Sequence, residues 1–315
     1  MKKIYISLLV VMTIILSGCS SKDEIISEGS MAIEETLGKT NNIEDGADED
    51  LIDLINEKTI EVLGDYKDNV AIYFKNLNTN EEYYLNENIY YAAASTNKVP
   101  LAMMILDEVN NGDKSLDDVL YFNEEDREEG SGILLSLDEV PNLTINEAIY
   151  LSIIESDNIA KNMLARVAKA DINDYMRYVT GDRDIPDENY MTAKQLGIVL
   201  NRLYENPDNN PYYETLIEYM KKTNYHDRID KYLPYSKVAH KIGNYYRYYH
   251  DIGIVYGENP YILAILTKDI GELSNEALDD GGDEKRYLLD WGDKGCELIA
   301  QLSKEIYTIV EENKM

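Results

Sequence analysis

The chain has 315 residues, with 30 Lys and Arg against 60 Asp and Glu, so its formal net charge is −30 at pH 7. This acidic balance excludes a nucleic-acid-binding protein, which needs clustered Lys and Arg to contact phosphates, while 44% hydrophobic residues argue against a largely disordered chain. Two Cys and three His also exclude a disulfide scaffold and a zinc site built from Cys and His.

The N-terminus has the pattern of a secretory signal. Met1–Lys3 is basic and Ile4–Leu16 is almost wholly apolar, but this stretch is too short to span a bilayer comfortably. The small residues before Cys19 resemble the lipobox of bacterial lipoproteins, in which the cysteine is diacylated and becomes the new N-terminus. We therefore expect residues 1–18 to be a signal peptide and Cys19 to anchor the chain at the extracytoplasmic face of the cell membrane. An ordinary signal peptide with a chance cysteine, or a short membrane anchor, is the alternative.

Two further segments follow the signal. Residues 19–49 are rich in Ser, Glu, Asp, Asn and Gly and show little apolar periodicity, which is typical of a flexible acidic tether. Residues 50–315 have the apolar periodicity of a folded domain. Cys296, in a helix-like segment near the end, is expected to be an unpaired, buried apolar side chain.

The folded domain is predicted to open and close with strands, with helices between them. Helical spacing predicts a first helix over 51–63, and Thr144 with Glu147 forms a capping box that starts another. The other expected elements are a hairpin of 70–74 and 82–85, a helix over 97–110, further helices to about 222, strands at 249–256 and 261–267, and a last helix over about 285–310. The strands can pair into one antiparallel sheet flanked by the terminal helices, with an all-helical lobe inserted. The fold class is therefore α+β, an α/β sandwich.

Ser95-Thr96-Asn97-Lys98 is the first of three short motifs with candidate chemistry. A Ser hydroxyl is a poor nucleophile at neutral pH and needs an adjacent base. Three residues make about one helical turn, so Lys98 comes round to the face that holds Ser95, where a partly desolvated amine can act as that base. The helix N-terminus adds a positive dipole end and the Ser95 N–H for an oxyanion. Taken alone, the pattern is more often a Ser cap followed by an exposed Lys.

Ser156-Asp157-Asn158 is the second motif and follows the helix that Thr144 caps. The Ser156 hydroxyl can relay a proton to a leaving group, and the Asn158 carboxamide can hold both Lys98 and a substrate amide. In isolation, however, the motif is a set of polar turn residues that cap the next helix.

Lys241-Ile242-Gly243-Asn244 is the third motif and follows a strand-like stretch. Lys241 can bind a substrate carboxylate, Gly243 lets a ligand approach the backbone, and the Asn244 N–H can be a second oxyanion donor. The alternative is a Lys and a Gly that end an edge strand.

Together and in this order, the three motifs resemble the S-x-x-K, S-D-N and K-T-G set of the penicillin-recognising serine hydrolases, specifically the class A β-lactamases. The resemblance covers about residues 50–313. It extends to three flanking segments, which are Gly130–Leu134 followed by Leu143-Thr144, Met191–Lys194, and Ile252–Tyr256.

The resemblance implies a role for each motif residue. Ser95 would be the acylated nucleophile, Lys98 its base and Ser156 the proton relay. Asn158 would bind substrate, and Lys241 would recognise its carboxylate beside Gly243. The N–H groups of Ser95 and Asn244 would form the oxyanion hole.

Two departures from the family pattern affect the expected activity. Ile242 stands where the family has Thr or Ser, which removes a hydrogen bond to the substrate carboxylate worth about 1.5–3 kcal/mol. The stretch 179–189 is short and lacks the E-x-x-L-N whose Glu activates the deacylating water. Asp184, Asp187 and Glu188 are possible substitutes, but the spacing selects none of them. We therefore expect an acyl-Ser95 ester that is hydrolysed slowly.

Three functions follow from these features. The leading one is a membrane-anchored serine hydrolase that β-lactams or peptidoglycan-type peptides acylate. The second is a penicillin or muropeptide sensor without turnover, or a D-alanyl-D-alanine peptidase, and the third is a structural lipoprotein without chemistry. A Ser-His-Asp triad would have to draw on His226, His240 or His250, which are more often strand-end residues. We expect a monomer with no metal, no cofactor and no nucleic-acid partner.

Overall fold

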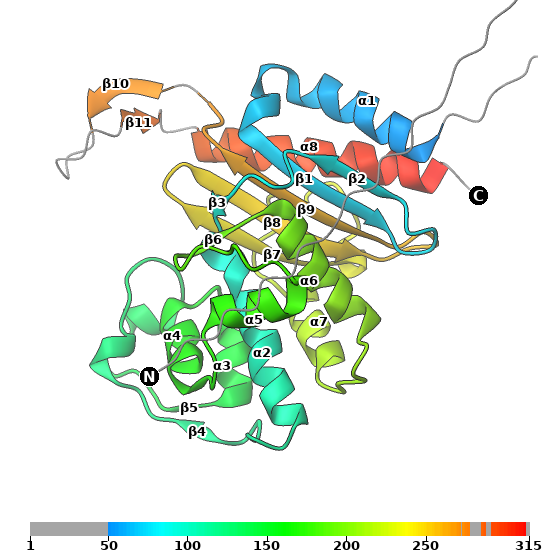
Figure 1. Ribbon diagram of the computed structural model, residues 1–315. Coiled ribbons are helices and arrows are strands. Elements are labelled where there is room, and N and C mark those ends of the chain that lie inside the picture. The colour runs from blue at the N-terminus through cyan, green and yellow to red at the C-terminus, as the bar shows by residue number, and fades with distance from the viewer. Residues whose placement is uncertain (1–49, 272, 278–284, 288–290, 313–315) are drawn as a thin grey trace, which may run out of the picture. The chain divides into compact units, whose positions relative to one another are not determined.

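A five-stranded antiparallel sheet forms the centre of the computed structural model, which describes residues 50–271, 273–277, 285–287 and 291–312 (Figure 1). Its strands, in the order β2-β1-β9-β8-β7, are β2 (Glu82–Leu85), β1 (Val70–Asn76), β9 (Tyr261–Lys268), β8 (Tyr248–Val255) and β7 (Val238–Tyr245). Ile72 of β1 pairs with Ile265 of β9, so the first strands of the domain join the last ones. This arrangement confirms the predicted α+β fold.

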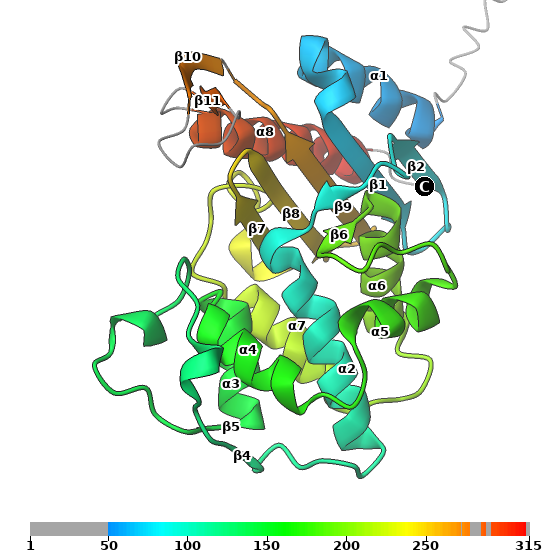
Figure 2. The same ribbon diagram turned by 60° about the vertical axis from the view of Figure 1, so that its left-hand side comes forward.

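The two terminal helices, α1 (Leu51–Leu63) and α8 (Trp291–Glu312), lie side by side on one face of the sheet (Figures 1 and 2). Successive side chains of a strand point to opposite faces, so Ile72 and Phe74 pack against these helices while Ala71 and Tyr73 face the other way. Asp50 caps α1 by accepting a hydrogen bond from the N–H of Ile52 at 3.0 Å. The predicted first helix is therefore confirmed in both its bounds.

The helical lobe lies on the opposite face of the sheet, as predicted (Figure 2). Its helices are α2 (Lys98–Asn110), α3 (Ile145–Ile154), α4 (Asn158–Val167), α5 (Ile172–Thr180), α6 (Ala193–Glu205) and α7 (Tyr213–Lys221). Helix α6 packs closely on β1, because a Cβ at Gly197 would stand 2.1 Å from the ring of Tyr73. The predicted capping box begins α3, with Thr144 and Glu147 exchanging hydrogen bonds.

Two short antiparallel strand pairs lie outside the main sheet. Strand β3 (Tyr91–Ala92) pairs with β6 (Tyr190–Met191), and β4 (Val119–Leu120) pairs with β5 (Leu143–Thr144). Strand β3 leads directly into the 3₁₀ turn η2 (Ala94–Asn97), which runs into α2. The first motif therefore lies where the sheet and the helical lobe meet.

The predicted start of the last helix is wrong. The helix α8 begins at Trp291 instead of about residue 285, and residues 285–287 form strand β11 (Lys285–Tyr287). This strand pairs with β10 (Leu273–Ala277), which the sequence pattern did not predict, with Ala277 opposite Lys285. The backbone groups of residues 285–287 are engaged in this ladder, so the helix starts after it.

The signal peptide, Cys19 and the tether lie outside the described residues, so those expectations stay predictions. Within the described ranges, no helix combines the length and the apolar character needed to cross a membrane. Cys296 is buried in α8 as predicted, but it is not in a purely apolar setting. Its Sγ accepts a hydrogen bond from Nε of Arg228 at 3.1 Å, and burial raises the pKa of its thiol to about 11.

Candidate active site

The nucleophile candidate Ser95 lies in the turn η2, one helical turn before Lys98 at the start of α2. Nζ of Lys98 donates a hydrogen bond to Oγ of Ser95 at 2.9 Å, as the spacing of the motif predicted. The residue before the nucleophile, Ala94, has a positive φ of 49°, a conformation that costs energy for any residue with a Cβ. The turn is thus held in a strained conformation next to the reactive hydroxyl.

Lys98 is buried and surrounded by hydrogen-bond acceptors of the second motif. Its Nζ donates to the carbonyl oxygen of Ser156 at 2.6 Å and to Oδ1 of Asn158 at 2.8 Å, and lies 3.2 Å from Oγ of Ser156. Burial and the positive charge of Lys161 lower the pKa of Lys98 to about 7, partly opposed by Asp157 and Glu128. A substantial share of Lys98 is therefore neutral at physiological pH and can accept a proton.

The second motif connects α3 to α4. Asp157 caps α4, with Oδ1 accepting from the N–H of Ala160 at 3.0 Å, while its Oδ2 accepts from the N–H of Leu134 at 2.8 Å. Gly132 is required here, because a Cβ at this position would stand 2.2 Å from Oδ2 of Asp157. Asp157 is therefore structural, and it fixes the backbone that presents Ser156 with a positive φ of 53°.

The third motif lies within β7, the edge strand of the sheet, which continues to Tyr245. Nζ of Lys241 donates to Oγ of Ser156 at 3.0 Å and to the carbonyl oxygen of Ile242 at 3.1 Å. A Cβ at Gly243 would stand 2.9 Å from the carbonyl oxygen of Ala93, so only glycine lets β7 approach the nucleophile turn this closely. The structure thus brings all three motifs together around Ser156.

A cleft of about 710 Å³ opens at this place. It is lined by Ala94, Ser95, Asn97, Lys98, Glu128, Glu129, Gly130, Ser131, Asn158, Lys161, Asn189, Asn244, Tyr245 and Tyr246. Of the predicted site residues, Ser95, Lys98, Asn158 and Asn244 line it. Ser156, Lys241 and Gly243 lie buried behind the lining. Burial, with the nearby charge of Lys98, holds the pKa of Lys241 well below its usual range.

Ile242, the residue that departs from the family motif, is also buried and is not among the residues that line the cleft. An isoleucine side chain can offer no hydrogen bond to a ligand, so the hydroxyl of the family motif is absent at this position.

The carboxylates proposed from the 179–189 stretch do not reach the cleft. Asp184, Asp187 and Glu188 are exposed and are not among the lining residues, and Asp187 is ion-paired with Arg177 at 2.9 Å. The same stretch instead contributes Asn189, whose Oδ1 accepts from Nδ2 of Asn97 at 2.9 Å. A carboxamide thus lies next to the nucleophile turn.

Two carboxylates that the sequence pattern did not single out do line the cleft, Glu128 and Glu129. Oε2 of Glu128 accepts from Nζ of Lys161 at 2.9 Å and from Nδ2 of Asn162 at 2.8 Å. Partial burial raises the pKa of Glu128, but the bonds to Lys161 and Asn162 outweigh this effect and lower the pKa below its usual value. No short motif pointed to this group, because its members come together only through the packing of α4 on the 123–134 loop.

Arg228 is a further residue that the sequence pattern missed. It is buried, and its guanidinium donates to the carbonyl oxygen of His250 at 2.6 Å and to Oδ1 of Asn244 at 2.6 Å. It thereby fixes the end of β7 that contributes Asn244 to the cleft. His250 has a structural place as well, since its Nε2 donates to the carbonyl oxygen of Ala92 at 2.8 Å and its Nδ1 accepts from the N–H of Thr267.

This geometry can perform nucleophilic chemistry. The amine of Lys98 contacts the Ser95 hydroxyl directly, the hydroxyl of Ser156 lies 3.2 Å from the same amine, and residues of η2 and β7 line the cleft. The catalytic roles themselves stay predictions.

The β-lactamase enzyme family profile matches residues 55–310, and the chain belongs to this family. No match is found among curated protein sequences. Solved structures share the fold. A β-lactamase from Sphaerobacter thermophilus has a TM-score of 0.68 at 20% identity, covering 84% of this chain and 99% of that one.

Structures of PBP-A are equally similar. One has a TM-score of 0.69 at 21% identity and covers 82% of this chain and 96% of that chain. A substituted form of PBP-A, described as an acyl-enzyme complex with penicillin G, has a TM-score of 0.68 at 21% identity, with 82% and 97% covered. At such identities the likeness shows the fold, which agrees with the class A β-lactamase resemblance of the motifs.

Proposed function

We propose that this member of the β-lactamase enzyme family is a serine hydrolase that β-lactams acylate at Ser95. The observation that carries the proposal is the 2.9 Å hydrogen bond between Lys98 and Ser95, made by an amine whose pKa is lowered to about 7. Such an amine can remove the hydroxyl proton at neutral pH, which is the step that an isolated serine cannot perform.

Acylation then follows from the contacts around the nucleophile. Lys98 takes the proton of Ser95, and Oγ attacks the lactam carbonyl carbon to form a tetrahedral oxyanion, for which the N–H groups of Ser95 and Asn244 are the donors. When the carbon–nitrogen bond breaks, the hydroxyl of Ser156 gives its proton to the departing nitrogen. Ser156 recovers a proton from the amines beside it, since Lys98 and Lys241 both lie within hydrogen-bonding distance.

Substrate binding rests on the polar side chains of the cleft. Asn158 uses Oδ1 to hold Lys98 and Nδ2 to donate to the carbonyl oxygen of Glu129 at 3.0 Å, so its carboxamide is fixed in place to meet a substrate amide. Lys241 is fully buried behind Ser156, so its amine would act on a substrate carboxylate through that hydroxyl. With Ile242 buried, carboxylate recognition is weakened, as expected from the motif.

Deacylation is proposed to be slow. Hydrolysis of the ester needs a base for the attacking water, and the carboxylates of the 179–189 stretch do not line the cleft, whose described carboxylates are Glu128 and Glu129. Asn189, which lies there, cannot accept a proton, and Glu128 is engaged by Lys161 and Asn162, which lower its pKa and so its basicity. The acyl-enzyme should therefore accumulate.

A chromogenic cephalosporin tests this function. The purified protein should show a burst of one product molecule per active site followed by a slow steady rate, because acylation is faster than deacylation. Ser95→Ala should show neither phase. Rapid turnover without a burst would contradict slow deacylation, and an unchanged signal in Ser95→Ala would contradict acylation at Ser95.

A second function, a penicillin or muropeptide sensor or a D-alanyl-D-alanine peptidase, is favoured by the same feature, a cleft that the carboxylates of the 179–189 stretch do not line. A sensor keeps its adduct, whereas a peptidase must release the acyl group. Incubation with a peptide ending in D-alanyl-D-alanine separates them, because only the peptidase would release free D-alanine in a Ser95-dependent way.

We also propose that Cys19 carries the lipid that holds the domain at the extracytoplasmic face of the cell membrane. The support is the lipobox-like sequence before Cys19 and the basic and apolar stretch that precedes it. Cells fed a labelled fatty acid should incorporate label into the wild-type protein and not into Cys19→Ser. Equal labelling of both proteins would contradict the anchor. The proposed monomer is checked by light scattering of the detergent-solubilised protein.

A further inference from the structure

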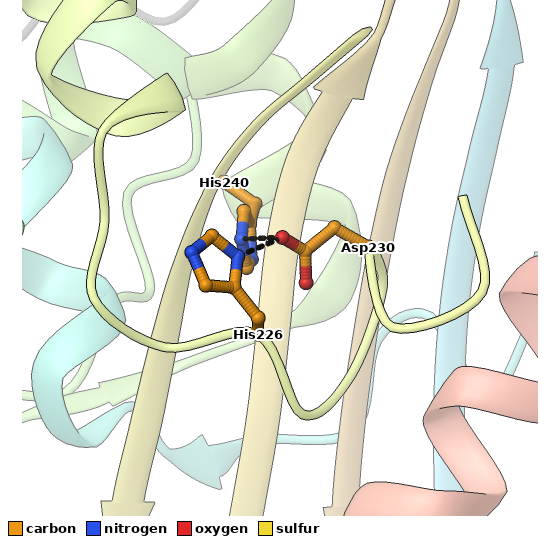
Figure 3. Close-up of side chains that lie close together, drawn as sticks. All are labelled: His226, Asp230 and His240. Atoms are coloured by element: carbon orange, nitrogen blue, oxygen red, sulfur yellow. Dashed lines mark hydrogen bonds and ion pairs between the residues drawn. The ribbon is translucent and has the colours of Figure 1, made fainter. Parts of the chain in front are cut away.

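A cluster of two imidazoles and a carboxylate lies on the far side of β7 from Lys241. His226 and Asp230 come from the loop between α7 and β7, and His240 comes from β7 itself. Figure 3 shows the three side chains pointing toward one another, with the Asp230 carboxylate contacting both rings. One donor atom from each residue lies within 4.8 Å of the others.

Two atoms of this cluster are buried without a hydrogen-bond partner within the part of the chain that the structure describes. They are Nε2 of His240 and Oδ1 of Asp230, whose side chains are each 1% exposed. Nε2 of His240 and Oδ2 of Asp230 lie 3.2 Å apart and form an ion pair when the ring is protonated, but without well-aligned hydrogen-bond geometry. A buried polar atom left without a partner costs free energy, so this arrangement calls for a ligand.

We propose that His226, Asp230 and His240 form a binding site for a divalent transition-metal ion of the zinc class. Donor atoms held by a tetrahedral zinc ion lie about 3.3 Å apart, and the Asp230 Oδ2–His240 Nε2 distance is 3.2 Å. The closer His226–Asp230 contact must lengthen, and the donor of His226, which lies within 4.8 Å of that of His240, can adjust because His226 is on a loop and 34% exposed. The composition argument excluded a site made of Cys and His alone, whereas this one takes an aspartate as its third donor.

Asp251 contacts His240 at the ring nitrogen that does not face the proposed metal position. Its carboxylate oxygens accept from Nδ1 of His240 at 3.0 and 2.9 Å, so one ring proton stays on Nδ1 and a metal would bind at Nε2 in place of the other. Among the described residues, Asp230 and Asp251 form ion pairs only with histidines. Although burial opposes it, Asp251 and Asp230 raise the pKa of His240 to about 10 in the absence of metal, and a divalent cation would take the place of the second ring proton in balancing the two carboxylates.

The choice of metal follows from the donors. Two of the three are imidazole nitrogens, which suit zinc and its neighbours in the transition series and not calcium or magnesium, whose ligands are oxygens. His226 is 34% exposed, so the side of the site that it forms is open to solvent, and water can be the fourth ligand.

Binding would fasten the 223–235 loop to the sheet. Arg228 lies in this loop between the two ligands, and the N–H of Ile229 donates to Oδ2 of Asp251 at 3.0 Å. A metal that joins His226 and Asp230 to His240 therefore also holds Arg228 against Asn244. We expect the free energy of unfolding to rise with the logarithm of the metal concentration once that concentration exceeds the dissociation constant.

Zinc titration of the purified, untagged protein after removal of metal by a chelator tests the site. We expect one ion per chain by elemental analysis, a rise in the thermal midpoint with Zn²⁺ but not with Ca²⁺, and visible absorption bands of tetrahedral cobalt with Co²⁺. His226→Ala should lower zinc affinity by more than about 100-fold and abolish the cobalt bands.

The matched control is Tyr235→Leu. The ring of Tyr235 stacks on His226 at 4.3 Å between centroids, so this variant removes the packing partner and keeps all three donors. It should bind zinc within a few-fold of the wild type. Equal loss in both variants, binding that survives His226→Ala, or no binding by the wild type would overturn the proposal. If His226→Ala does not fold, Asp230→Asn removes the anionic donor and gives the same readouts.

Discussion

Lys98 and Lys241 place their amine nitrogens 3.2 and 3.0 Å from the same atom, Oγ of Ser156. Both side chains are buried, so both positive charges are disfavoured, and the charge of Lys98 lowers the pKa of Lys241 further. The shared hydroxyl connects the two amines to the nucleophile through Lys98. These contacts link residues of all three sequence motifs, since Ser95 and Lys98 belong to the first, Ser156 to the second and Lys241 to the third.

The rate of acylation should rise with pH through about 7. Lys98 acts as a base only when neutral, and its pKa is lowered to about 7 by burial and by Lys161, against the opposing charges of Asp157 and Glu128, with Lys241 facing it across Ser156. Below that pH the rate should fall about tenfold per pH unit. Stopped-flow acylation from pH 5 to 9 measures this, and a flat profile would contradict Lys98 as the base.

Charge changes on the cleft wall should move that midpoint in opposite directions. Lys161→Met removes a positive charge that lowers the pKa of Lys98, so the midpoint should move to higher pH, whereas Glu128→Gln should move it to lower pH. Each shift should be below about one pH unit, because these groups are partly exposed. The double variant should return close to the wild type. Two shifts of the same sign would contradict this electrostatic explanation.

Ser156→Ala and Ser156→Gly form a pair that separates chemistry from strain. Both remove the hydroxyl between the amines and should slow acylation by about 10²–10⁴-fold, as expected for loss of a proton relay. Because residue 156 has a φ of 53°, the glycine variant should be more stable than the alanine variant by about 1 kcal/mol in urea unfolding. Normal acylation by either variant would remove Ser156 from the mechanism.

Gly243→Ala should impair both stability and acylation. The added Cβ would stand 2.9 Å from the carbonyl oxygen of Ala93, so β7 must move away from the nucleophile turn, at a cost of about 1–3 kcal/mol.

The control for this variant is Gly295→Ala in α8, where the nearest atom would be Cβ of Tyr249 at 3.4 Å, an ordinary contact. The control should acylate normally and lose no stability, since alanine favours a helix. Equal effects of the two substitutions would show that the close approach of β7 is not required.

Much of the fold could be predicted from the sequence because its signals are local. The first helix follows from apolar spacing and ends at Leu63 as predicted, and the capping box at Thr144 marks the start of α3. The strand β11 was missed because three residues carry no periodicity, and its formation depends on pairing with β10. Long-range pairing of this kind has no signature in a short segment.

The site could be predicted only as far as its motifs reach. Ser95 and Lys98 meet through one helical turn, so their contact follows from spacing alone. Three other features depend on how distant loops pack, and no motif encodes them. They are the burial of Lys241, the Glu128–Lys161 ion pair and the hydrogen bond from Arg228 to Asn244. The resemblance to a family also directed attention to the 179–189 stretch, whereas the carboxylates of the cleft come from residues 128 and 129.

The most direct test is intact-mass spectrometry of the purified protein mixed with benzylpenicillin and followed over time. We predict that the protein gains the mass of one penicillin, that the adduct persists after the free drug is removed, and that Ser95→Ala forms none. Free protein together with fully hydrolysed drug would contradict slow deacylation. Neither adduct nor hydrolysis would contradict acylation of Ser95 by β-lactams altogether.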